Sequence, residues 1–386
     1  MKIILFTHPS FMQSQSMPRY AKMLWDYFKA KGDDIQTLSP SPFFYKLGFN
    51  SFTSKWFGYI DQYIVFPLLV WIRLRKYDKD TLFVFADQAL GPWVPLVATR
   101  KHIVHCHDFL ALRSALGEFA ENPTSFSGRL YQSFIRKGFS KGKNFISVSK
   151  QTQADLHKYY LGEKIEFSEV VYNGLNQTFE KLDPLESKHQ MESFINKKLP
   201  SGYILHVGGN QWYKNREGAI DLYSAWRSEF KKDIPLILLG QTPEGKVLEA
   251  IEKSEFKSSI YLALDTPNDF VNKAYSGATL LLFPSLAEGF GWPIAEALAS
   301  GTLVITTNEA PMNEVGGEIA YYIKRMPHEK DERQVWLKES SKVLENVIGL
   351  SQEQKDTKIH EGLNFVERFS TEQSLNAINN LYTKIV

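Results

Sequence analysis

The sequence predicts an α/β protein of two domains, each built on a parallel sheet. Short β-rich runs alternate with amphipathic helical stretches, the pattern typical of parallel α/β layers. At 386 residues the chain is long enough for two domains that each bury their own core. Apolar residues make up 43% and charged residues 23% of the chain, so we expect an ordinary folded protein rather than a disordered one.

The strands predicted from these runs fall into two sets. A charged stretch with prolines toward both ends, residues 179–200, lies between the sets. We therefore expect an N-terminal domain over residues 1–180 and a C-terminal domain over residues 195–369, with the junction inside this stretch. The predicted strands are residues 2–7, 81–86, 102–106 and 145–149 in the first set, and 203–208, 235–240, 260–265, 279–285 and 303–307 in the second.

The last segment, residues 370–386, predicts a helix. Ser370 and Gln373 have the spacing of a capping box, in which two side chains satisfy the free backbone donors at a helix start. Four apolar residues then share one helical face, which predicts that the helix packs on a domain surface. They are Leu375, Ile378, Leu381 and Tyr382.

Composition excludes several classes of function. A net charge of +2 gives no electrostatic case for nucleic acid as a partner. The single cysteine, Cys106, rules out an internal disulfide framework and favours a reducing compartment. The first apolar stretch is too short for a signal peptide, and the longest apolar run, residues 64–72, is about half of a bilayer span. We expect a cytoplasmic protein with no membrane crossing.

The segment AEGFGWPIAEALASG, residues 287–301, is the most informative stretch for function. Pro293 suits the first turn of a helix and Gly301 the position just beyond its end, so PIAEALAS is predicted as a short helix. The free N–H groups at its start carry a partial positive charge and point at the EGFG loop. Glu288 and Glu296 add carboxylate acceptors that suit vicinal hydroxyls of a sugar or ribose. Together they indicate a nucleotide diphosphate-sugar site.

The glycines and the glutamates of this segment each have an alternative explanation. A dinucleotide fingerprint needs a third glycine or alanine three places after Gly291, where Ile294 stands, and no glycine follows the first strand before Gly32. Hydride chemistry is therefore disfavoured. Glutamates at such a spacing also occur as solvated side chains in most proteins, so the pair alone does not define a site.

Several motifs in order give the chain a resemblance to a known family. FPSLAEGFGWPIAEALASGTLVITTN, followed by NEVGGEIAYYI, closely resembles the signature of family 4 of the retaining glycosyltransferases, which have the GT-B fold. HVGGNQWYKN, AYSGATLLLFPS, VVYNGLN and SVSKQTQADL match further pieces of that family. The resemblance implies two Rossmann-like domains facing a cleft, the nucleotide held mainly by the second, and a last helix that crosses back onto the first.

The resemblance also implies roles for particular residues. Glu288 would bind hydroxyls of the donor sugar and Glu296 the ribose. Lys214, in the WYKN stretch, would stabilise the departing diphosphate, because a positive charge is what a phosphate leaving group requires. The remaining donor-side positions are the amides of Gly289, Phe290 and Gly291, Asn210 in the HVGGNQWYKN motif, and the backbone near Leu262 and Leu264 at the base.

The N-terminal domain offers candidates at the end of the strand HIVHC. His105, His107 and Asp108 lie where open α/β sheets place their ligands. A zinc site is one reading, but His105 and His107 share one face of the strand while Cys106 and Asp108 point to the other. Structural histidines are a second reading. The family resemblance favours a third, in which His107 lies against the donor sugar or the acceptor.

Two further segments of this domain bear on the site. Asp78 and Asp80 form a D-x-D pair, a metal motif in other glycosyltransferases, but here they precede a strand and predict a polar turn. Relatives usually have a glycine-rich loop after the first strand, whereas this chain has HPSFMQSQSMPRY. Ser14, Ser16 or Arg19 would have to replace backbone amides on the acceptor side.

Together these observations predict an enzyme that moves a sugar from a nucleotide diphosphate-sugar to an acceptor hydroxyl with retention. The resemblance implies that the leaving phosphate takes the acceptor proton, so no protein nucleophile is expected. Because Lys214 and the helix N-terminus can stabilise the diphosphate charge, no metal or cofactor is expected either, and the catalytic candidates are Glu288, Lys214 and His107. A nucleotide-sugar epimerase and a non-catalytic sugar- or phospholipid-binding protein remain as alternatives.

The acceptor and the location are suggested by two basic, aromatic stretches. Residues 42–77 hold twelve aromatic residues and five Lys or Arg against the single acid Asp61. Residues 122–154 hold six Lys or Arg and no acid. Such surfaces suit an anionic bilayer, although many of these aromatics also suit a core. We expect peripheral binding at an anionic membrane surface and a lipid-linked or saccharide acceptor in polysaccharide synthesis.

Overall fold

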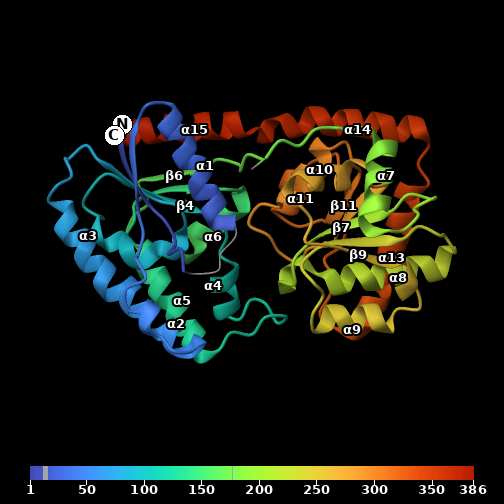
Figure 1. Ribbon diagram of the computed structural model, residues 1–386, viewed down its shortest axis with the longest axis horizontal. Coiled ribbons are helices and arrows are strands. Elements are labelled where there is room, and N and C mark those ends of the chain that lie inside the picture. Colours follow the sequence, from blue (N-terminus) through green and yellow to red (C-terminus); the bar gives the residue numbers. More distant parts are fainter. Residues whose placement is uncertain (12–15, 176) are drawn as a thin grey trace. The chain divides into compact units, whose positions relative to one another are not determined.

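The computed structural model describes residues 1–11, 16–175 and 177–386, and for Ser16 only the backbone. The predicted acceptor-side residue Ser14 and the side chain of Ser16 lie outside the described part. The chain forms two compact units. The first unit comprises residues 1–119, 123–176 and 371–386, and the second comprises residues 120–122 and 177–370. Each unit is built on a parallel sheet of six strands with helices on its faces (Figure 1).

The first sheet has the strand order β2-β1-β3-β4-β5-β6, and every pair of neighbours is parallel. Its central strands are buried on both faces because helices cover both sides, which explains why β1 after Lys2 and β3 are wholly apolar and why even the two histidines of β4 are buried. The strands are β1 Lys2–Phe6, β2 Asp34–Leu38, β3 Leu82–Phe85, β4 His102–Cys106, β5 Asn144–Ser147 and β6 Phe167–Val170. The helices are α1 Ser16–Ala30, α2 Ser51–Ile60, α3 Phe66–Leu74, α4 Leu110–Ala115, α5 Phe126–Phe139, α6 Lys150–Tyr159 and α15 Thr371–Ile385, with η1 Tyr45–Leu47, η2 Asp61–Val65 and η3 Gln88–Leu96.

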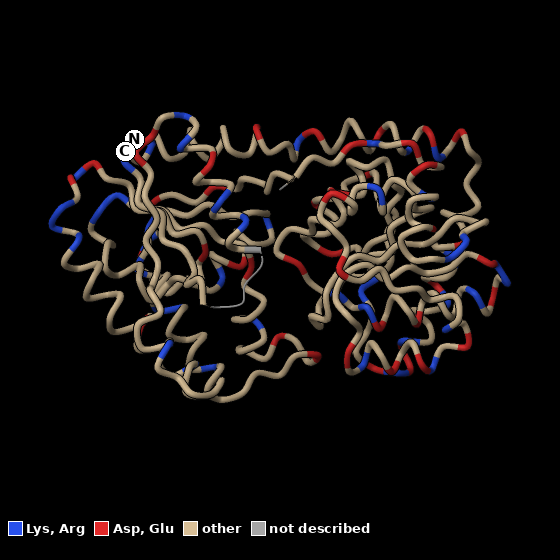
Figure 2. Tube along the Cα trace, in the orientation of Figure 1, with Lys and Arg blue, Asp and Glu red and all other residues tan. Residues whose placement is uncertain are grey.

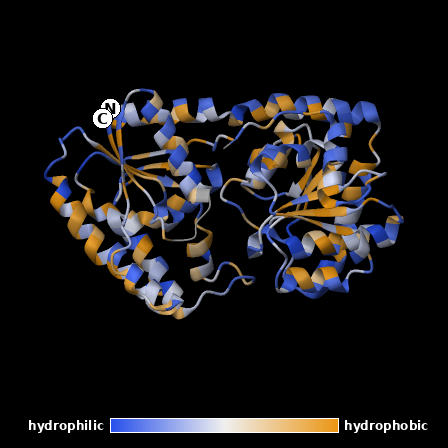
Figure 3. Cartoon of the chain, viewed as in Figure 1, coloured by the Kyte–Doolittle hydropathy of each residue, from blue (hydrophilic) through white to orange (hydrophobic). Residues whose placement is uncertain are grey.

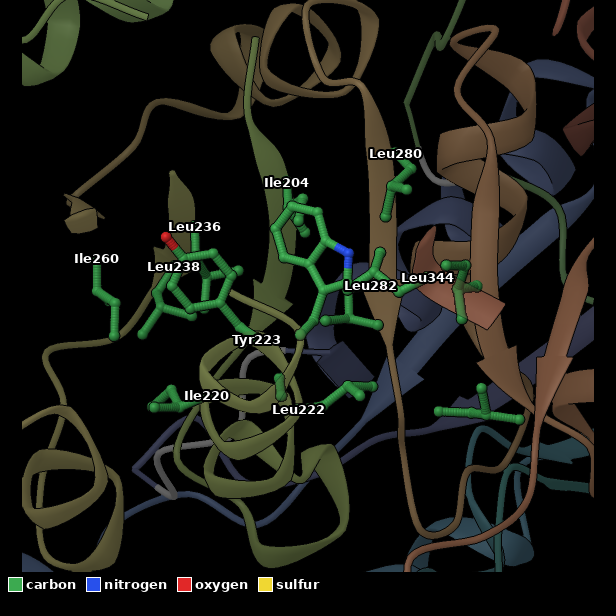
Figure 4. Packing of buried hydrophobic residues seen from close by; sticks show 14 of the residues in the cluster. Ile204, Ile220, Leu222, Tyr223, Leu236, Leu238, Ile260, Leu280, Leu282 and Leu344 are labelled. Atoms are coloured by element: carbon green, nitrogen blue, oxygen red, sulfur yellow. The ribbon is translucent and has the colours of Figure 1, made fainter. Parts of the chain in front are cut away.

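The second sheet has the order β12-β11-β10-β7-β8-β9, again parallel throughout. Figure 4 shows Tyr223 of helix α8 (Arg216–Phe230) beside Leu236 and Leu238 of one strand, in a core cluster that also includes Ile204 and Leu280. The strands are β7 Ile204–Gly208, β8 Leu236–Gly240, β9 Ile260–Leu264, β10 Leu280–Phe283, β11 Val304–Thr307 and β12 Tyr321–Ile323. The helices are α7 Pro184–Ile195, α8 Arg216–Phe230, α9 Lys246–Lys253, α10 Asn268–Ser276, α11 Trp292–Ala299, α12 Met312–Gly316, α13 Lys330–Ile348 and α14 Gln352–Val366, with η4 Trp212–Lys214, η5 Lys257–Ser259 and η6 Glu367–Phe369.

All nine strands predicted from the sequence are present, and three strands were missed. The missed strands, β2, β6 and β12, each lie at the edge of a sheet. Edge strands are partly exposed, so their apolar pattern is weak. The stretch 179–200, where the junction was expected, contains α7 and belongs entirely to the second unit, whose main segment begins at Gln177.

The last helix, α15, belongs to the first unit, as the resemblance implied. Tyr382 stacks on Phe28 of α1, with ring centroids 5.1 Å apart. Its hydroxyl lies 2.7 Å from His105 Nε2, and Tyr20 OH lies 2.8 Å from Nδ1 of the same ring. Leu375 and Ile378 are buried in the same cluster. The helix therefore completes one face of the first sheet.

A long helix in the first unit departs from the sequence prediction. Residues Ser51–Leu74 form one continuous helix from α2 through the π-helical turn η2 to α3. Within the described residues this is the one helix long and apolar enough to cross a membrane, judged by length and composition alone. The sequence analysis measured only the unbroken run 64–72, because Gly58 and Asp61 interrupt the apolar pattern before it.

Candidate active site

The predicted donor residues lie at the point where the strand order of the second sheet reverses. The chain runs from β7 to β8 and β9 on one side, and β10 then returns to the other side of β7. In open α/β sheets, ligands bind outside the carboxyl ends of the strands at this switch point. The loops after β7 and β10 are therefore the expected binding loops, and they carry Lys214 and Glu288.

The loop after β10 has the geometry predicted for an anion-binding helix start. Gly291 is the N-cap of α11 with a φ of 105°, a left-handed conformation that a side chain would strain. Gly301, with a φ of 72°, follows the C-cap residue Ser300 and ends the helix as predicted. Phe290 is buried and packs edge-to-face on Phe369, with centroids 5.4 Å apart. The loop is thus anchored by the Phe290 side chain.

Lys214 and Glu288, predicted separately, are in direct contact. Lys214 Nζ lies 2.8 Å from Oε1 and 3.0 Å from Oε2 of Glu288. The side chains are only 16% and 8% exposed, so this pair is largely shielded from solvent. Ser285 Oγ lies 2.7 Å from the same carboxylate, and the Lys214 ammonium lies 5.2 Å from the centre of the Phe283 ring. The pair is therefore fixed by polar and aromatic neighbours.

Arg216, which was not predicted from the sequence, contacts the predicted donor-side residue Asn210. It is 2% exposed, and its Nη1 donates to Asn210 Oδ1 at 2.7 Å and to the Gln241 carbonyl at 2.8 Å. Its Nε and Nη2 have no hydrogen-bond partner among the described residues. Burial lowers the pKa of this guanidinium to about 10, and the group is still charged at neutral pH.

A signal for Arg216 exists in the sequence. It is the first residue of α8, directly after the N-cap Asn215, whose side chain accepts a hydrogen bond from Gly218 N. A positive charge in the first turn opposes the helix dipole. An arginine at this position therefore does not serve helix stability through the dipole. Asn210, a predicted donor-side residue, is held by this guanidinium and by its own Nδ2, which donates to the Thr242 carbonyl at 2.7 Å.

The remaining donor candidates lie on neighbouring elements. Glu296 is half-buried on α11, and Tyr275 OH donates a hydrogen bond to its Oε2 at 2.8 Å. Burial, and secondarily the Glu296 carboxylate, raise the pKa of Tyr275 well above its usual value, so the hydroxyl keeps its proton. Leu264 ends the edge strand β9, at the carboxyl side of the sheet, whereas Leu262 lies two residues earlier with an exposed side chain.

The first sheet also reverses its strand order, between β1 and β3, and a second polar pair lies there. His8 follows β1, Asp87 follows β3, and His8 Nε2 lies 2.8 Å from Asp87 Oδ2. Asp87 also accepts from Ala89 N at 2.9 Å. Burial alone would raise the pKa of Asp87, but the hydrogen bond and charge of His8 outweigh it and hold the pKa below its usual value. The sequence analysis did not single out either residue.

The residues predicted after β4 are mostly engaged within the fold. His107 is buried, and its Nε2 donates to the Ala86 carbonyl at 2.9 Å. Burial lowers the pKa of His107, so the ring is neutral. His105 lies between Tyr20 and Tyr382, the structural reading of this histidine.

The other acceptor-side candidates are in turn and helix positions. Asp108 Oδ1 accepts from Leu110 N at 3.0 Å at the start of α4, and Arg19 is exposed on α1. In the part of the chain that the structure describes, no group of three or more His, Cys, Asp and Glu is arranged to hold a metal. Asp78 and Asp80 form a turn, as predicted, in which Thr81 N donates to the Asp78 carbonyl.

Comparison with solved structures identifies the architecture. Two Rossmann-like parallel sheets and a last helix that returns to the first define the GT-B fold. A glycosyltransferase from Rickettsia africae ESF-5 has this fold with a TM-score of 0.66 and 15% identity, covering 100% of this chain and 98% of that one. At this identity the likeness shows the fold alone.

Sequence comparison adds a family match for part of the second unit. Residues 188–324, which include Lys214, Arg216, Glu288 and Glu296, match the model of the family described as glycosyl transferases group 1. The O-antigen chain mannosyltransferase RfbU of Salmonella typhimurium is 28% identical over 203 residues, 52% of either chain. The O-antigen chain mannosyltransferase B of Escherichia coli is 32% identical over 119 residues, 30% of this chain and 31% of that one. The chain thus spans about half the length of the first relative and about a third of the second.

Proposed function

We propose that this chain is a retaining glycosyltransferase of the family 4 type, which transfers a hexosyl group from a nucleoside diphosphate-sugar to an acceptor hydroxyl. The observation that carries the proposal is the Lys214–Glu288 pair at the switch point of the second sheet, inside the segment that matches the group 1 family model. A fixed ammonium beside a carboxylate suits a ligand that has both a diphosphate and sugar hydroxyls.

Different residues of the site would bind the diphosphate, the sugar and the ribose of the donor substrate. Lys214, the N–H groups at the start of α11 and the unpartnered nitrogens of Arg216 supply positive charge for the diphosphate. Glu288 accepts from hydroxyls of the donor sugar, and Glu296, held by Tyr275, accepts from the ribose. The positive charge from these groups makes a metal or other cofactor unnecessary for the leaving group.

In the reaction, the bond between the anomeric carbon and the diphosphate oxygen breaks, and a bond to the acceptor oxygen forms on the same face. The acceptor proton passes to the departing phosphate oxygen, so the products are the glycoside and the nucleoside diphosphate. Lys214 stabilises the charge that grows on the diphosphate as the bond breaks. No side chain forms a covalent intermediate.

We assign the acceptor to the first unit. The His8–Asp87 pair at the switch point of the first sheet supports this assignment, because the carboxylate fixes the imidazole through Nε2 and an imidazole has a second nitrogen that can bond a hydroxyl. His107 helps to position Asp87, because its Nε2 donates a hydrogen bond to the carbonyl of the preceding residue, Ala86. The names of the relatives make a saccharide of cell-surface polysaccharide or lipopolysaccharide the first acceptor class to test, and mannose the first sugar. We place the reaction in the cytoplasm.

A thermal-shift panel of UDP-, GDP-, ADP- and dTDP-sugars tests the proposal. A donor present at one hundred times its Kd stabilises the protein by about 2.7 kcal/mol, and we expect this from one base class. Incubation of that donor with saccharide acceptors, followed by NMR of the product anomer, then tests transfer and retention. An epimerase would instead convert the donor without any acceptor, and a binding protein would leave the donor unchanged.

A further inference from the structure

The first unit carries a concentration of exposed apolar side chains. Of the 21 large apolar side chains that are exposed among the described residues, ten lie between residues 43 and 72 and three lie on α5. Phe49 is 83% exposed, Phe126 71% and Trp56 56%. Figure 3 shows hydrophobic colour along much of α2 and α3. Apolar exposure on this scale marks an interaction surface.

The helix Ser51–Leu74 is anchored to the protein along one side. Asp61 is 1% exposed and accepts hydrogen bonds from the backbone N–H groups of Phe44 and Tyr45 at 2.9 and 2.8 Å. Trp93 Nε1 donates to the Gln62 carbonyl at 2.9 Å, and the Phe66 ring packs on Trp93 with centroids 4.6 Å apart. These contacts place one face of the helix in the core of the first unit. The helix therefore exposes only its opposite face. This arrangement differs from that of a membrane-crossing helix, which lipid surrounds on all sides.

Helix α5 extends the same surface. Tyr63 OH lies 2.7 Å from Tyr131 OH, and the Tyr63 ring meets Phe134 edge-to-face with centroids 5.4 Å apart. Phe126, Leu130 and Phe134 recur every four residues, which places them on one face of α5. Helix Ser51–Leu74, the segment before it and α5 thus form one surface. We call it the apolar face, and it consists of the exposed side chains of residues 43–76 and 126–137; Figure 1 shows the course of these helices.

The charges around the apolar face have one sign. Between residues 42 and 77 the only acid is Asp61, which is buried, whereas the five Lys or Arg are all exposed. Helix α5 has no acid and contributes the exposed Arg129 and Lys137. Lys and Arg are marked in blue along these helices in Figure 2. Basic groups that border exposed aromatic and aliphatic side chains match an anionic lipid surface.

From this geometry we infer that the apolar face docks into the interface of an anionic lipid bilayer, with helix Ser51–Leu74 lying on the membrane. The apolar side chains enter the headgroup and acyl boundary, and the Lys and Arg side chains meet the lipid phosphates. A second copy of the chain is a poorer occupant, because a two-fold contact would bring the basic groups of both copies together. The inference is independent of the donor chemistry proposed above.

Sedimentation of the full chain with vesicles tests the inference without any sugar donor. We expect binding to vesicles that contain phosphatidylglycerol, little binding to pure phosphatidylcholine, and a steady loss with rising salt. The triple variant Trp56→Ser, Leu68→Ser, Trp71→Ser should lose binding. The matched variant Leu185→Ser, Leu248→Ser, Val335→Ser, which removes three exposed apolar side chains from the second unit, should bind like the parent.

A charge variant keeps the test informative if the apolar variant folds poorly. Lys55→Gln, Arg73→Gln, Lys76→Gln changes only exposed side chains and should weaken vesicle binding by about a hundredfold, since each Lys or Arg near an anionic surface contributes about 1 kcal/mol. The inference is overturned if the parent does not sediment with anionic vesicles at low salt. Dimer formation by analytical ultracentrifugation without vesicle binding would also overturn it. Vesicle binding by a protein that transfers no sugar would refute the proposed function alone.

Discussion

Lys214 Nζ lies within hydrogen-bond distance of both carboxylate oxygens of Glu288, at 2.8 and 3.0 Å. The two residues follow strands β7 and β10, which are neighbours in the sheet although the residues are 74 positions apart in the chain. A donor that binds here has to share or replace this contact. The ion pair therefore holds both side chains in a defined position in the absence of a ligand.

Replacement of Lys214 should affect turnover more than donor affinity. In Lys214→Ala we expect kcat to fall by about a hundredfold, because charge on the leaving diphosphate grows toward the transition state. Steady-state kinetics with varied donor separates kcat from KM. Lys253→Ala, which removes a lysine from an exposed ion pair in the same unit, is the matched control. An unchanged kcat with a raised KM would make Lys214 a ground-state binder.

Replacement of Glu296 should weaken nucleotide binding. The ribose loses a charged hydrogen-bond acceptor in Glu296→Ala, which costs roughly 1.5–3 kcal/mol of binding free energy. Calorimetry with the free nucleoside diphosphate measures this loss directly. Glu229→Ala on the exposed face of α8 serves as the control. Equal affinities of Glu296→Ala and the parent would refute the ribose assignment.

Replacement of Arg216 should discriminate between phosphate and base recognition. We expect Arg216→Gln to weaken binding of the nucleoside diphosphate about tenfold or more, because a buried charge that faces the phosphates is lost. Binding of the nucleoside without phosphates should change little. Calorimetry with both ligands gives the comparison. If both affinities fall by the same factor, Arg216 only supports Asn210 and the Gln241 loop.

The His8–Asp87 pair should act on the acceptor and not on the donor. Asp87→Asn removes the charge that fixes the His8 ring, so we expect kcat/KM for the acceptor to fall about tenfold or more. The Kd of the donor should stay that of the parent. Asp78→Asn, a change in an exposed turn of the same unit, is the control. A parallel loss of donor affinity would show that the pair maintains the fold of the first unit instead.

Stability should fall in mild acid. Burial lowers the pKa of His105 and of His206 to about 3, whereas an unfolded histidine titrates near 6.5. Between pH 6.5 and 3 the unfolded state binds more protons, so stability is full above pH 6.5 and decreases as the pH falls. Each histidine contributes up to about 1.4 kcal/mol per pH unit in that window.

Urea unfolding at several pH values between 7.5 and 5 checks this dependence. We expect the midpoint to decrease toward pH 5, and His206→Leu to flatten the transition of the second unit. His360→Ala, at an exposed position in α14, should keep the slope of the parent. A midpoint that does not change with pH would show that these rings are accessible to protons in the folded state.

The sequence predicted secondary structure best where a few neighbouring residues determine the backbone conformation or the burial of a strand. Strands buried on both faces were found from their apolar runs, and the start and end of α11 from Pro293 and Gly301, because these residues fix the backbone by themselves. Edge strands such as β2 were missed because half of their side chains face solvent. The extent of the long helix was hidden by Asp61, whose burial depends on hydrogen bonds to η1.

The site residues that were not predicted from the sequence depend on contacts between segments that are distant in the chain. His8 and Asp87 are 79 residues apart, and neither is unusual in its own surroundings. Their proximity follows from the adjacency of β1 and β3, which becomes visible only when the strand order is known. Arg216 was overlooked because an arginine at a helix start is usually a solvated side chain, and its burial becomes visible only in the structure.

The return of α15 to the first unit has a consequence for synthesis on the ribosome. The side chains of Leu375, Ile378 and Tyr382 form part of the first unit's core, so this unit is completed last although its strands emerge first. Until then the apolar surface around Phe28 and His105 lacks its cover. The first unit therefore lacks part of its core throughout translation of the second unit, because the residues that complete it are synthesised last.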